Sequence, residues 1–368
     1  IISAFHRYDT RIFLKQCGIL AKKGHNVTLI TNDNGIDEDI NGVKIVTTNF
    51  IYKSRLQRIL FTRKVNLIKA LEIDADIYQL HDPELIPVGI KLKKKGKKII
   101  FDSHEDFPRQ ILEKDWIPSL IRKFISRSAE WYINKTFKKF DVILSVTPHI
   151  AENLKKASDK VFLLTNYPLL EDKFNDFTKD DYVSRDNQLC YAGTVYRSSM
   201  QENISQSIHN IDDIKYTIVG TFNPVYKNDI EKYLRSPKIE VLDKVPREDL
   251  LKMYNKMTIG IAIFDYSPNL GYKIGSLGVN KIFEYMYYGL PIICTDFELW
   301  KEIVDKHKCG IYVNPHNIDE ITKAVLFLIA NKEKAFEMGQ NGRKAILNEY
   351  NWDRQGEIYL KIIKALVK

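Results

Sequence analysis

Short apolar segments alternate with amphipathic ones along the first half of the chain. Most of the apolar segments are apolar on both faces, as buried parallel strands are. They predict strands at residues 1–5, 26–31, 43–48, 76–81, 98–103, 142–147 and 161–166. Helical patterns separate several of these strands. The clearest runs from Asp9 to Lys23, with Asp9 or Thr10 as N-cap and Gly24 as its end.

A second series of strands occupies the other half of the chain. These strands are predicted at residues 189–195, 215–220, 239–245, 259–264, 291–296 and 310–315. Strand–helix alternation that occurs twice predicts two doubly wound α/β domains. The polar stretch from Tyr167 to Asn187 breaks the alternation, so we expect the link between the domains there. The tail predicts an amphipathic helix with one apolar face, formed by Tyr359, Ile362, Ile363 and Leu366.

Composition agrees with this picture. The chain has 368 residues, of which 44% are hydrophobic and 28% charged, which is typical of globular proteins. The length fits two domains of roughly 170 residues each. No apolar run approaches the roughly 18 residues of a membrane-spanning helix, and no signal peptide is visible. We therefore expect a cytoplasmic protein. Because Ile1 already lies in a predicted strand, we also expect residues before it.

The four cysteines are far apart and form no CxxC pair. This spacing favours buried thiols in a reducing compartment over disulfides or a metal site. They are Cys17, Cys190, Cys294 and Cys309.

Positive charge is concentrated in the first half. Residues 1–160 hold 29 Lys and Arg against 19 Asp and Glu, a net charge of +10, and the remainder carries −1. Two predicted helices, 55–71 and 119–140, mix basic residues with large apolar ones. They fit either peripheral contact with an anionic membrane or packing on the sheet with a charged outer face. The lysine run at 91–98 is typical of a solvated helix end.

Candidate chemistry is concentrated in the segment NKIFEYMYYGLP, residues 280–291. We expect Asn280 to cap a helix that Lys281 opens, after a glycine-bearing loop. The free N–H groups and the dipole of such a helix start favour phosphate, and Lys281 adds charge. Glu284, one turn on, could accept hydrogen bonds from a ribose diol. By spacing alone, a solvated Lys–Glu pair is the plainer interpretation.

The stretch NKIFEYMYYGLPIICTD resembles the donor-site signature of family 4 glycosyltransferases, K-x-F/L-E-x-M-x-x-G-x-P-V-I. Residues 6–31 and 74–108 resemble an O-antigen and capsule subgroup, and DKHKCGIYVNP resembles the family's G-x-x-V-x-P strand. The resemblance implies a GT-B fold, with two Rossmann-like domains facing across a cleft. It predicts an acceptor-binding domain (1–170), a nucleotide-sugar-binding domain (171–350) and a C-terminal helix (351–368) that returns to the first domain.

The resemblance also assigns roles to residues of the second domain. Lys281 would contact the donor diphosphate and Glu284 the ribose. The family's second acidic residue, eight positions earlier, is here Ser276, so backbone groups from Gly275 to Gly278 could replace it. Arg197 is the nearest match to a phosphate-binding basic residue. The remaining donor-binding candidates are Gly193, Thr194, Lys244, Val245, Gly278 and Asn280. For Lys244 and Val245, a solvated turn is an equal interpretation.

Two histidines, His81 and His104, end predicted strands, where open α/β sheets bind ligands. His104 resembles the family's interdomain histidine near the transferred sugar and is a catalytic candidate with Lys281 and Arg197. His81 and Glu105 are acceptor-side candidates.

Two further acceptor-side candidates, Asp9 and Arg11, lie where the family has a glycine-rich loop. They could instead be an N-cap and a solvated arginine.

The resemblance implies a retaining transferase without a metal or other cofactor. Its donor would be a UDP-sugar, or else a GDP-sugar, and its acceptor a glycan or polyprenyl-diphosphate-linked saccharide of bacterial surface polysaccharide synthesis. Lys281, Arg197 and the helix start would stabilise the leaving diphosphate. The acidic run at 37–39 lies far in sequence from the donor segment, and we expect no metal there.

Two other functions stay open from the sequence. A sugar-nucleotide epimerase would need acid–base carboxylates and no acceptor. A non-catalytic subunit of a glycosyltransferase complex is favoured by Ser276 but disfavoured by the intact Lys281 and Glu284. No nucleic-acid-binding module is recognisable, so no nucleic-acid partner is expected.

Overall fold

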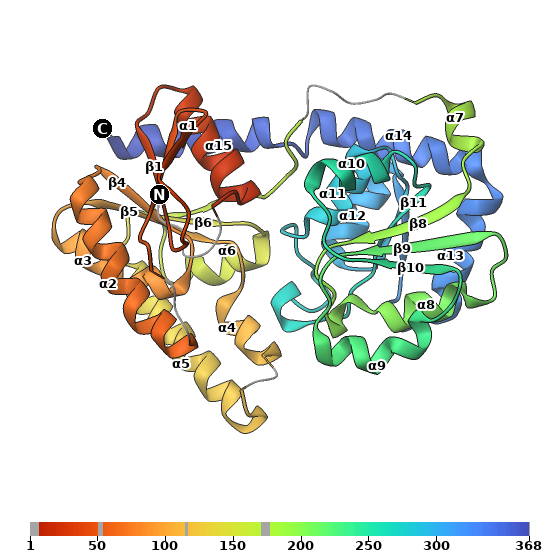
Figure 1. Ribbon diagram of the computed structural model, residues 1–368, viewed down its shortest axis with the longest axis horizontal. Helices are drawn as coiled ribbons and strands as arrows, with labels where there is room; N and C mark the ends of the chain where they lie inside the picture. Colours follow the sequence, from red (N-terminus) through yellow and green to blue (C-terminus); the bar gives the residue numbers. More distant parts are fainter. Residues whose placement is uncertain (1–6, 51–53, 115–116, 171–176, 368) are drawn as a thin grey trace. The chain divides into compact units, whose positions relative to one another are not determined.

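The computed structural model describes residues 7–50, 54–114, 117–170 and 177–367 (Figure 1). The chain forms two compact units. Unit 1 contains Ile1–Asn166 and Trp352–Lys368, and unit 2 contains Tyr167–Asn351. The chain therefore leaves unit 1 once, builds unit 2 from one continuous stretch, and returns for its last helix.

Unit 1 contains a parallel four-stranded sheet in the order β4-β5-β6-β7 and a three-stranded sheet in the order β1-β3-β2. Their bounds are β1 Val27–Thr31, β2 Glu38–Ile40, β3 Val43–Thr47, β4 Ile77–Leu80, β5 Lys98–Ser103, β6 Val142–Ser145 and β7 Val161–Leu163. The strand predicted at 1–5 lies outside the described residues. The sequence did not predict β2, an edge strand antiparallel to β3 that has no apolar pattern.

The helices of unit 1 cover its sheets (Figure 1). They are η1 Thr10–Cys17, α1 Gly18–Lys22, α2 Arg55–Ile73, η2 Pro83–Leu85, α3 Ile86–Lys94, α4 Phe107–Gln110, η3 Ile111–Glu113, α5 Ser119–Phe137, α6 Pro148–Lys155 and α15 Trp352–Val367. The first helix begins as predicted, because the Asp9 carboxylate accepts a hydrogen bond from the Ile12 N–H. Its first two turns are π-helical rather than α-helical, a feature frequent at functional sites.

The last helix, α15, belongs to unit 1, as expected of a helix that returns to the first domain. Its buried Tyr359 hydroxyl donates to Gln79 Oε1 at 2.6 Å. The side chain of Gln355 accepts from the Thr165 N–H at 2.9 Å. These bonds hold α15 against β4 and against the segment that follows β7.

Unit 2 contains one parallel six-stranded sheet in the order β10-β9-β8-β11-β12-β13. Its strands are β8 Asn187–Ala192, β9 Ile214–Val219, β10 Ile239–Leu242, β11 Ile259–Ala262, β12 Ile292–Thr295 and β13 Gly310–Val313. The chain builds the sheet outward from β8 in one direction and from β11 in the other. The order therefore reverses between β8 and β11, and ligands of such sheets bind at the carboxyl ends of the two strands at this point.

The helices of unit 2 complete the doubly wound arrangement predicted from the sequence (Figure 1). They are α7 Lys179–Val183, η4 Arg197–Ser199, α8 Gln201–His209, α9 Pro224–Leu234, α10 Arg247–Tyr254, η5 Pro268–Leu270, α11 Asn280–Tyr287, α12 Glu298–His307, α13 Ile318–Ala330 and α14 Lys332–Asn348. In the described part of the chain, none of the helices is both long and apolar enough to cross a bilayer.

All four cysteines are buried and unbridged, as their spacing predicted. Burial raises the pKa of each thiol, for example that of Cys309 to about 12. These side chains therefore act as small apolar residues of the two cores.

Candidate functional site

Two glycines shape the carboxyl ends of β8 and β9 in unit 2. Gly193 follows β8 with φ +136°, and Gly220 follows β9 with φ +141°. The Gly193 N–H donates to the Val219 carbonyl at 2.8 Å. A Cβ on Gly220 would lie 2.1 Å from the Gly193 carbonyl oxygen. Only glycine fits these positions, which lets the backbone come close to whatever lies at the strand ends.

Lys281 lies beside this turn, at the point where the strand order reverses. A Cβ on Gly193 would come within 2.7 Å of both Cε and Nζ of Lys281. The ammonium group lies 4.9 Å from the ring centre of Tyr191, at the end of β8, and 5.3 Å from that of Phe264, after β11. The side chain thus reaches from α11 to the crevice that the sheet topology marks out.

The Lys281 ammonium group is largely withdrawn from water. Burial lowers its pKa to about 8, although Glu284 acts in the opposite direction. Among the described residues, it has no carboxylate within salt-bridge distance and donates no hydrogen bond. A desolvated cation without an anionic partner is costly, and a bound anion would relieve that cost.

The start of α11 differs by one residue from the prediction. Asn280 is the first helical residue and Val279 is the N-cap, so the expected capping by Asn280 is wrong. The extended backbone of Val279 allows the helix to begin there. No side chain caps the helix start, and Asn280 Oδ1 is buried without a partner among the described residues. The first N–H groups of α11 are therefore available to an anion next to Lys281.

The loop before α11 is held in place from α12. Ser276 is buried, and its carbonyl accepts a hydrogen bond from Trp300 Nε1 at 3.0 Å. Its hydroxyl accepts from the Gly278 N–H at 3.1 Å. Gly275, at φ +84°, packs on the Phe297 side chain so closely that a Cβ would lie 2.5 Å from the Phe297 Cβ and 2.7 Å from its ring Cγ. The Ser276 side chain is thus engaged within its own loop.

Glu284 lies one turn into α11 with two partners. Arg247 Nη1 donates to its Oε1 at 3.1 Å, and the Tyr254 hydroxyl donates to Oε2 at 3.4 Å. Arg247 opens α10, immediately after the loop that contains Lys244 and Val245. The loop after β10 therefore approaches α11. Nothing in the sequence singled out Arg247, since it is 37 residues away from Glu284.

The other donor-side candidates make local contacts. The Arg197 guanidinium pairs with Asp229 of α9, and its Cζ lies 5.3 Å from the centre of the Tyr226 ring, also of α9. These contacts hold Arg197 on α9 and do not bring it into the group around Lys281. The Thr194 carbonyl accepts from the Tyr191 hydroxyl at 2.9 Å. Lys244 is exposed, and Val245 packs against the core of unit 2.

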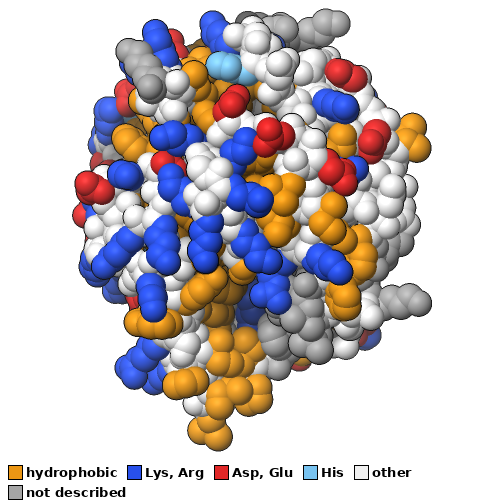
Figure 2. Space-filling view, turned by 90° about the vertical axis from the view of Figure 1, so that its left-hand side faces the viewer, with side chains coloured by type: hydrophobic (Ala, Val, Ile, Leu, Met, Phe, Trp, Pro, Cys, Tyr) orange, Lys and Arg blue, Asp and Glu red, His pale blue; other side chains and the backbone are white. Residues whose placement is uncertain are grey.

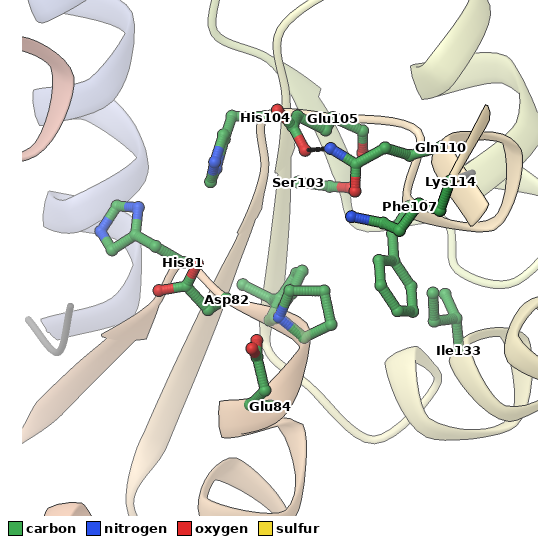
Figure 3. A pocket seen from close by; sticks show the side chains of 12 residues that line it. His81, Asp82, Glu84, Ser103, His104, Glu105, Phe107, Gln110, Lys114 and Ile133 are labelled. Atoms are coloured by element: carbon green, nitrogen blue, oxygen red, sulfur yellow. Dashed lines mark hydrogen bonds between the residues drawn. The ribbon is translucent and has the colours of Figure 1, made fainter. Parts of the chain in front are cut away.

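In unit 1, His81 and His104 follow the neighbouring strands β4 and β5. Their ring centres are 6.4 Å apart. A cavity of about 210 Å³ opens beside them at the carboxyl ends of the strands (Figure 3). Half of its polar lining is acidic or amide-bearing, and the whole polar lining consists of His81, Asp82, Glu84, Ser103, His104, Glu105, Gln110 and Lys114. Glu105 is exposed and accepts a hydrogen bond from Gln110.

A buried polar network centred on Asp102 lies next to His81. Asp102 accepts from Arg11 Nε at 2.9 Å and Nη2 at 2.8 Å, and from Gln16 at 2.7 Å. Its carboxylate also lies 3.4 Å from His81 Nδ1. Burial alone would raise the pKa of Asp102, but Arg11 and His81 together hold it well below its usual range. Burial lowers the pKa of His81 against the opposing effect of Asp102. Burial thus favours the neutral form of the His81 imidazole.

The alternative of a solvated Arg11 is wrong, because the side chain is buried in this network. The sequence could not predict the pairing of Arg11 with Asp102, because the two residues are 91 positions apart. Arg11 Nη1 has no hydrogen-bond partner among the described residues. The other early candidate, Asp9, serves as the N-cap of η1.

The acidic run at 37–39 makes structural contacts. Asp37 accepts from the Thr47 N–H, and Glu38 is ion-paired with Arg7 at 2.5 Å. Within the described residues, no group of three or more His, Cys, Asp or Glu side chains is arranged to hold a metal ion.

Comparison with known proteins gives concordant results for both units. The family profile described as "Glycosyl transferases group 1" matches residues 172–345, and that described as "Glycosyltransferase Family 4" matches residues 14–166. An uncharacterized glycosyltransferase of Methanocaldococcus jannaschii is 24% identical over 298 residues, which cover 75% of this chain and 70% of that protein.

Solved structures show the same architecture. A sucrose-phosphate synthase from Thermosynechococcus elongatus is 15% identical, with a TM-score of 0.77 over 100% of this chain and 95% of that chain. Anabaena HepE in complex with UDP and glucose is 10% identical, with a TM-score of 0.72 over 99% of both chains. These similarities show that the chain has the GT-B fold that its sequence predicted.

Proposed function

The chain belongs to the group 1 and family 4 glycosyltransferases, and on this basis we propose that it transfers a sugar from a nucleotide-sugar with retention of anomeric configuration. The donor is a UDP-sugar, with a GDP-sugar as second choice. UDP is bound in the structure of Anabaena HepE, which supports the first choice. The acceptor is a glycan or a polyprenyl-diphosphate-linked saccharide.

One observation carries the donor site, namely the unpaired, desolvated ammonium group of Lys281 next to Gly193. Together with the uncapped start of α11, it offers positive charge and N–H donors at the strand-order reversal. A diphosphate supplies the missing negative charge. Because charge grows on the diphosphate as the glycosidic bond breaks, the same groups stabilise the transition state. Transfer in this scheme uses protein charge and no metal.

The nucleoside is held by Glu284 through the ribose hydroxyls. Arg247 and Tyr254 hold the carboxylate from one side, which limits its rotation and leaves acceptor capacity for the diol. Gly193, Thr194, Lys244 and Val245 contribute backbone contacts, and Arg197 is a further phosphate contact once it leaves Asp229. At the sugar, backbone groups from Gly275 to Gly278 replace the acidic side chain that Ser276 lacks.

Unit 1 provides the acceptor side. The cavity beside His104 has hydrogen-bonding groups suited to a saccharide, and Glu105 and His81 lie in its lining. His104 is proposed to lie near the transferred sugar and to orient it. Asp9 and Arg11 shape this region from η1. We place the reaction in bacterial surface polysaccharide synthesis, such as that of O-antigen or capsule, at the inner face of the cytoplasmic membrane.

A donor screen tests this proposal. Purified protein is mixed with UDP- and GDP-sugars, and nucleotide release is measured with and without a polyprenyl-diphosphate-linked saccharide. Acceptor-dependent release that is lost in Lys281→Ala and Glu284→Ala, but kept in the surface variant Lys252→Ala, is the expected result. Release that survives both site variants would overturn the assignment. Epimerised donor without transfer would instead identify an epimerase.

A further inference from the structure

The first half of α5 exposes large apolar side chains on the surface of unit 1. Leu120 is 95% exposed, Phe124 is 74% exposed and Ile121 is 47% exposed. Single exposed apolar residues are common, but a group of three at one helix end marks an interaction surface. Figure 2 shows an apolar protrusion at the lower end of this face, where Figure 1 has the start of α5. We call Leu120, Ile121 and Phe124 the α5 tip.

Basic side chains border the α5 tip. Lys123 and Arg127 are exposed between and after its apolar residues, and neither has an acidic partner among the described residues. Further along the helix, the Lys135 ammonium group lies 5.0 Å from the centre of the exposed Trp131 ring. The single acidic residue of α5, Glu130, is paired with Arg109 at 2.6 Å. The positive charge of this face is therefore not neutralised by α5 itself.

More positive charge lies around α5. Lys138 and Lys139 are exposed directly after the helix, and Arg63 of α2 lies close enough to Tyr132 to lower its pKa, against the dominant raising effect of burial. Figure 2 shows Lys and Arg side chains gathered across the face above the protrusion. The apolar tip would meet the edge of the hydrocarbon region of a bilayer, and the basic surface beside it would meet the anionic headgroups.

We propose that α5 docks unit 1 on an anionic lipid bilayer. Leu120, Ile121 and Phe124 enter the interfacial region. Lys123 and Arg127 contact lipid phosphates at the level of the headgroups, and Trp131 lies at the interface above them. The binding itself is independent of the sugar transfer. Its purpose rests on the proposed function, because a lipid-linked acceptor is presented at such a surface.

Charge argues against a second copy of the chain as the occupant. A symmetric contact through the α5 tip would bring two positive faces together, and residues 1–160 carry a net charge of +10. An anionic bilayer, in contrast, attracts every basic side chain of the face at once. Each contributes about a five-fold gain in binding near the surface.

The same helix reaches the cavity beside His104. Ile133, on the buried side of α5, lines that cavity. Helix α5 is fastened to the segment that forms the cavity's rim. The Ser126 hydroxyl donates to the Pro108 carbonyl at 2.6 Å, and Arg122 Nη1 donates to the Leu112 carbonyl at 3.3 Å. Docking of the tip would thus fix the distance of the cavity from the bilayer.

That distance suits a lipid-linked saccharide. Leu120 and Ile133 are thirteen positions apart on one helix, which corresponds to about 20 Å along its axis. With the tip inserted, the cavity therefore lies at most about 20 Å from the bilayer surface. A saccharide joined to a membrane lipid through a diphosphate can bridge such a gap without leaving the membrane.

Vesicle flotation of the whole protein, without donor or acceptor, tests the docking. We expect flotation with vesicles rich in phosphatidylglycerol and none with pure phosphatidylcholine. The pair Leu120→Ser with Phe124→Ser, and separately the pair Lys123→Glu with Arg127→Glu, should each weaken binding by roughly ten-fold or more. Two matched pairs in unit 2 should bind normally: Leu326→Ser with Phe327→Ser, which are 43% and 42% exposed, and Lys323→Glu with Lys334→Glu.

A fluorescent label gives a second measurement that does not depend on folding of the multiple variants. Because the native cysteines are buried, a single Leu120→Cys substitution can be labelled selectively. Vesicles with brominated lipids should quench a label at this site, while a label at Leu326→Cys should stay bright. Flotation that both pairs of α5 substitutions leave unchanged, or equal quenching at the two labelled sites, would overturn the proposal. A dimer that forms without vesicles and dissociates on the α5 substitutions would also overturn it.

These outcomes are separable from those of the donor screen. Failure of flotation with an active donor site would refute docking and leave the transferase proposal standing. Flotation by Lys281→Ala at the native level would show that docking needs no working donor site.

Discussion

The ammonium group of Lys281 and the α-carbon of Gly193 are so close that a Cβ on Gly193 would lie 2.7 Å from Nζ. One group comes from the start of α11 and the other from the turn after β8, 88 positions earlier in the chain. Their contact places an unpaired cation at the point where the sheet order reverses. The donor-site proposal depends on this relationship more than on any other.

Substitution Gly193→Ala should disrupt it directly. The new methyl group would displace the Lys281 side chain, and an alanine at φ +136° adds strain of about 1–3 kcal/mol. We expect kcat/KM to fall by roughly 10- to 100-fold, measured by nucleotide release, with the fold retained in circular dichroism. Gly96→Ala is the matched control, since it has φ +82° and open space around its Cβ. If both variants lose the same activity, strain rather than Lys281 is the cause.

Removing the charge of Lys281 should stabilise the unliganded protein. Because burial lowers its pKa to about 8, the unfolded chain binds this proton more strongly than the folded one. Lys281→Met should therefore raise the unfolding free energy at pH 7 by about 1–3 kcal/mol, with a discount for the partly exposed side chain. The gain should shrink as pH rises above about 8 and should vanish only well above about 10.5, where neither state is charged. Urea titrations across this range measure it, and a less stable variant at pH 7 would contradict the account.

Glu284 and Arg247 should affect donor binding more than turnover. Loss of the ribose contact in Glu284→Gln should raise the donor KM by roughly 10- to 100-fold with a smaller change in kcat. Arg247→Met frees the carboxylate to rotate and should raise KM by less. Arg235→Met, in another Arg–Glu pair of unit 2, is the control and should leave KM unchanged. An unchanged KM in Glu284→Gln would refute the ribose assignment.

Asp102 should be essential for the stability of unit 1. Asp102→Asn leaves the buried Arg11 cation without its partner, which should cost about 3–5 kcal/mol in unfolding free energy. The Asp102 pKa is held well below its usual value, so its stabilisation is present above about pH 4 and is lost as pH falls toward the folded-state pKa. Glu152→Gln, in an exposed pair with Lys155, should cost less than about 0.5 kcal/mol. Chemical denaturation at pH 7 and pH 3 compares them.

The sequence predicted those features that local pattern determines. The buried strands, the Asp9 cap and the last helix follow from apolar periodicity and capping residues, which need only neighbours in the chain. β2 was missed because Glu38–Ile40 has no apolar alternation and is ordered by its pairing with β3. The π-helical turns of η1 were missed because a π-helix and an α-helix share almost the same residue pattern.

Contacts between residues far apart in the chain could not be predicted from the sequence. Lys281 and Glu284 stood out through their motif, but the partners of Glu284 come from α10, and Arg11 finds Asp102 across 91 positions. Polarity suggested solvent for Arg11, whereas packing buried it with a carboxylate. Sequence spacing measures neither burial nor long-range pairing, so it could not show that the Lys281 cation lacks an anionic partner.

Calorimetric titration of the protein with UDP tests the donor-site account most directly, because it needs neither the sugar nor the acceptor to be known. The native protein should bind UDP, and Lys281→Ala should weaken the binding by roughly 30-fold or more, as expected for loss of a charge-assisted contact to phosphate. Lys252→Ala, at an exposed position of the same unit, should bind as the native protein does. The same titration is repeated with GDP. If the natural donor is a GDP-sugar, GDP should bind more tightly than UDP, and Lys281→Ala should weaken the binding of GDP to the same extent. Equal affinity of Lys281→Ala and the native protein for both nucleotides would contradict the account.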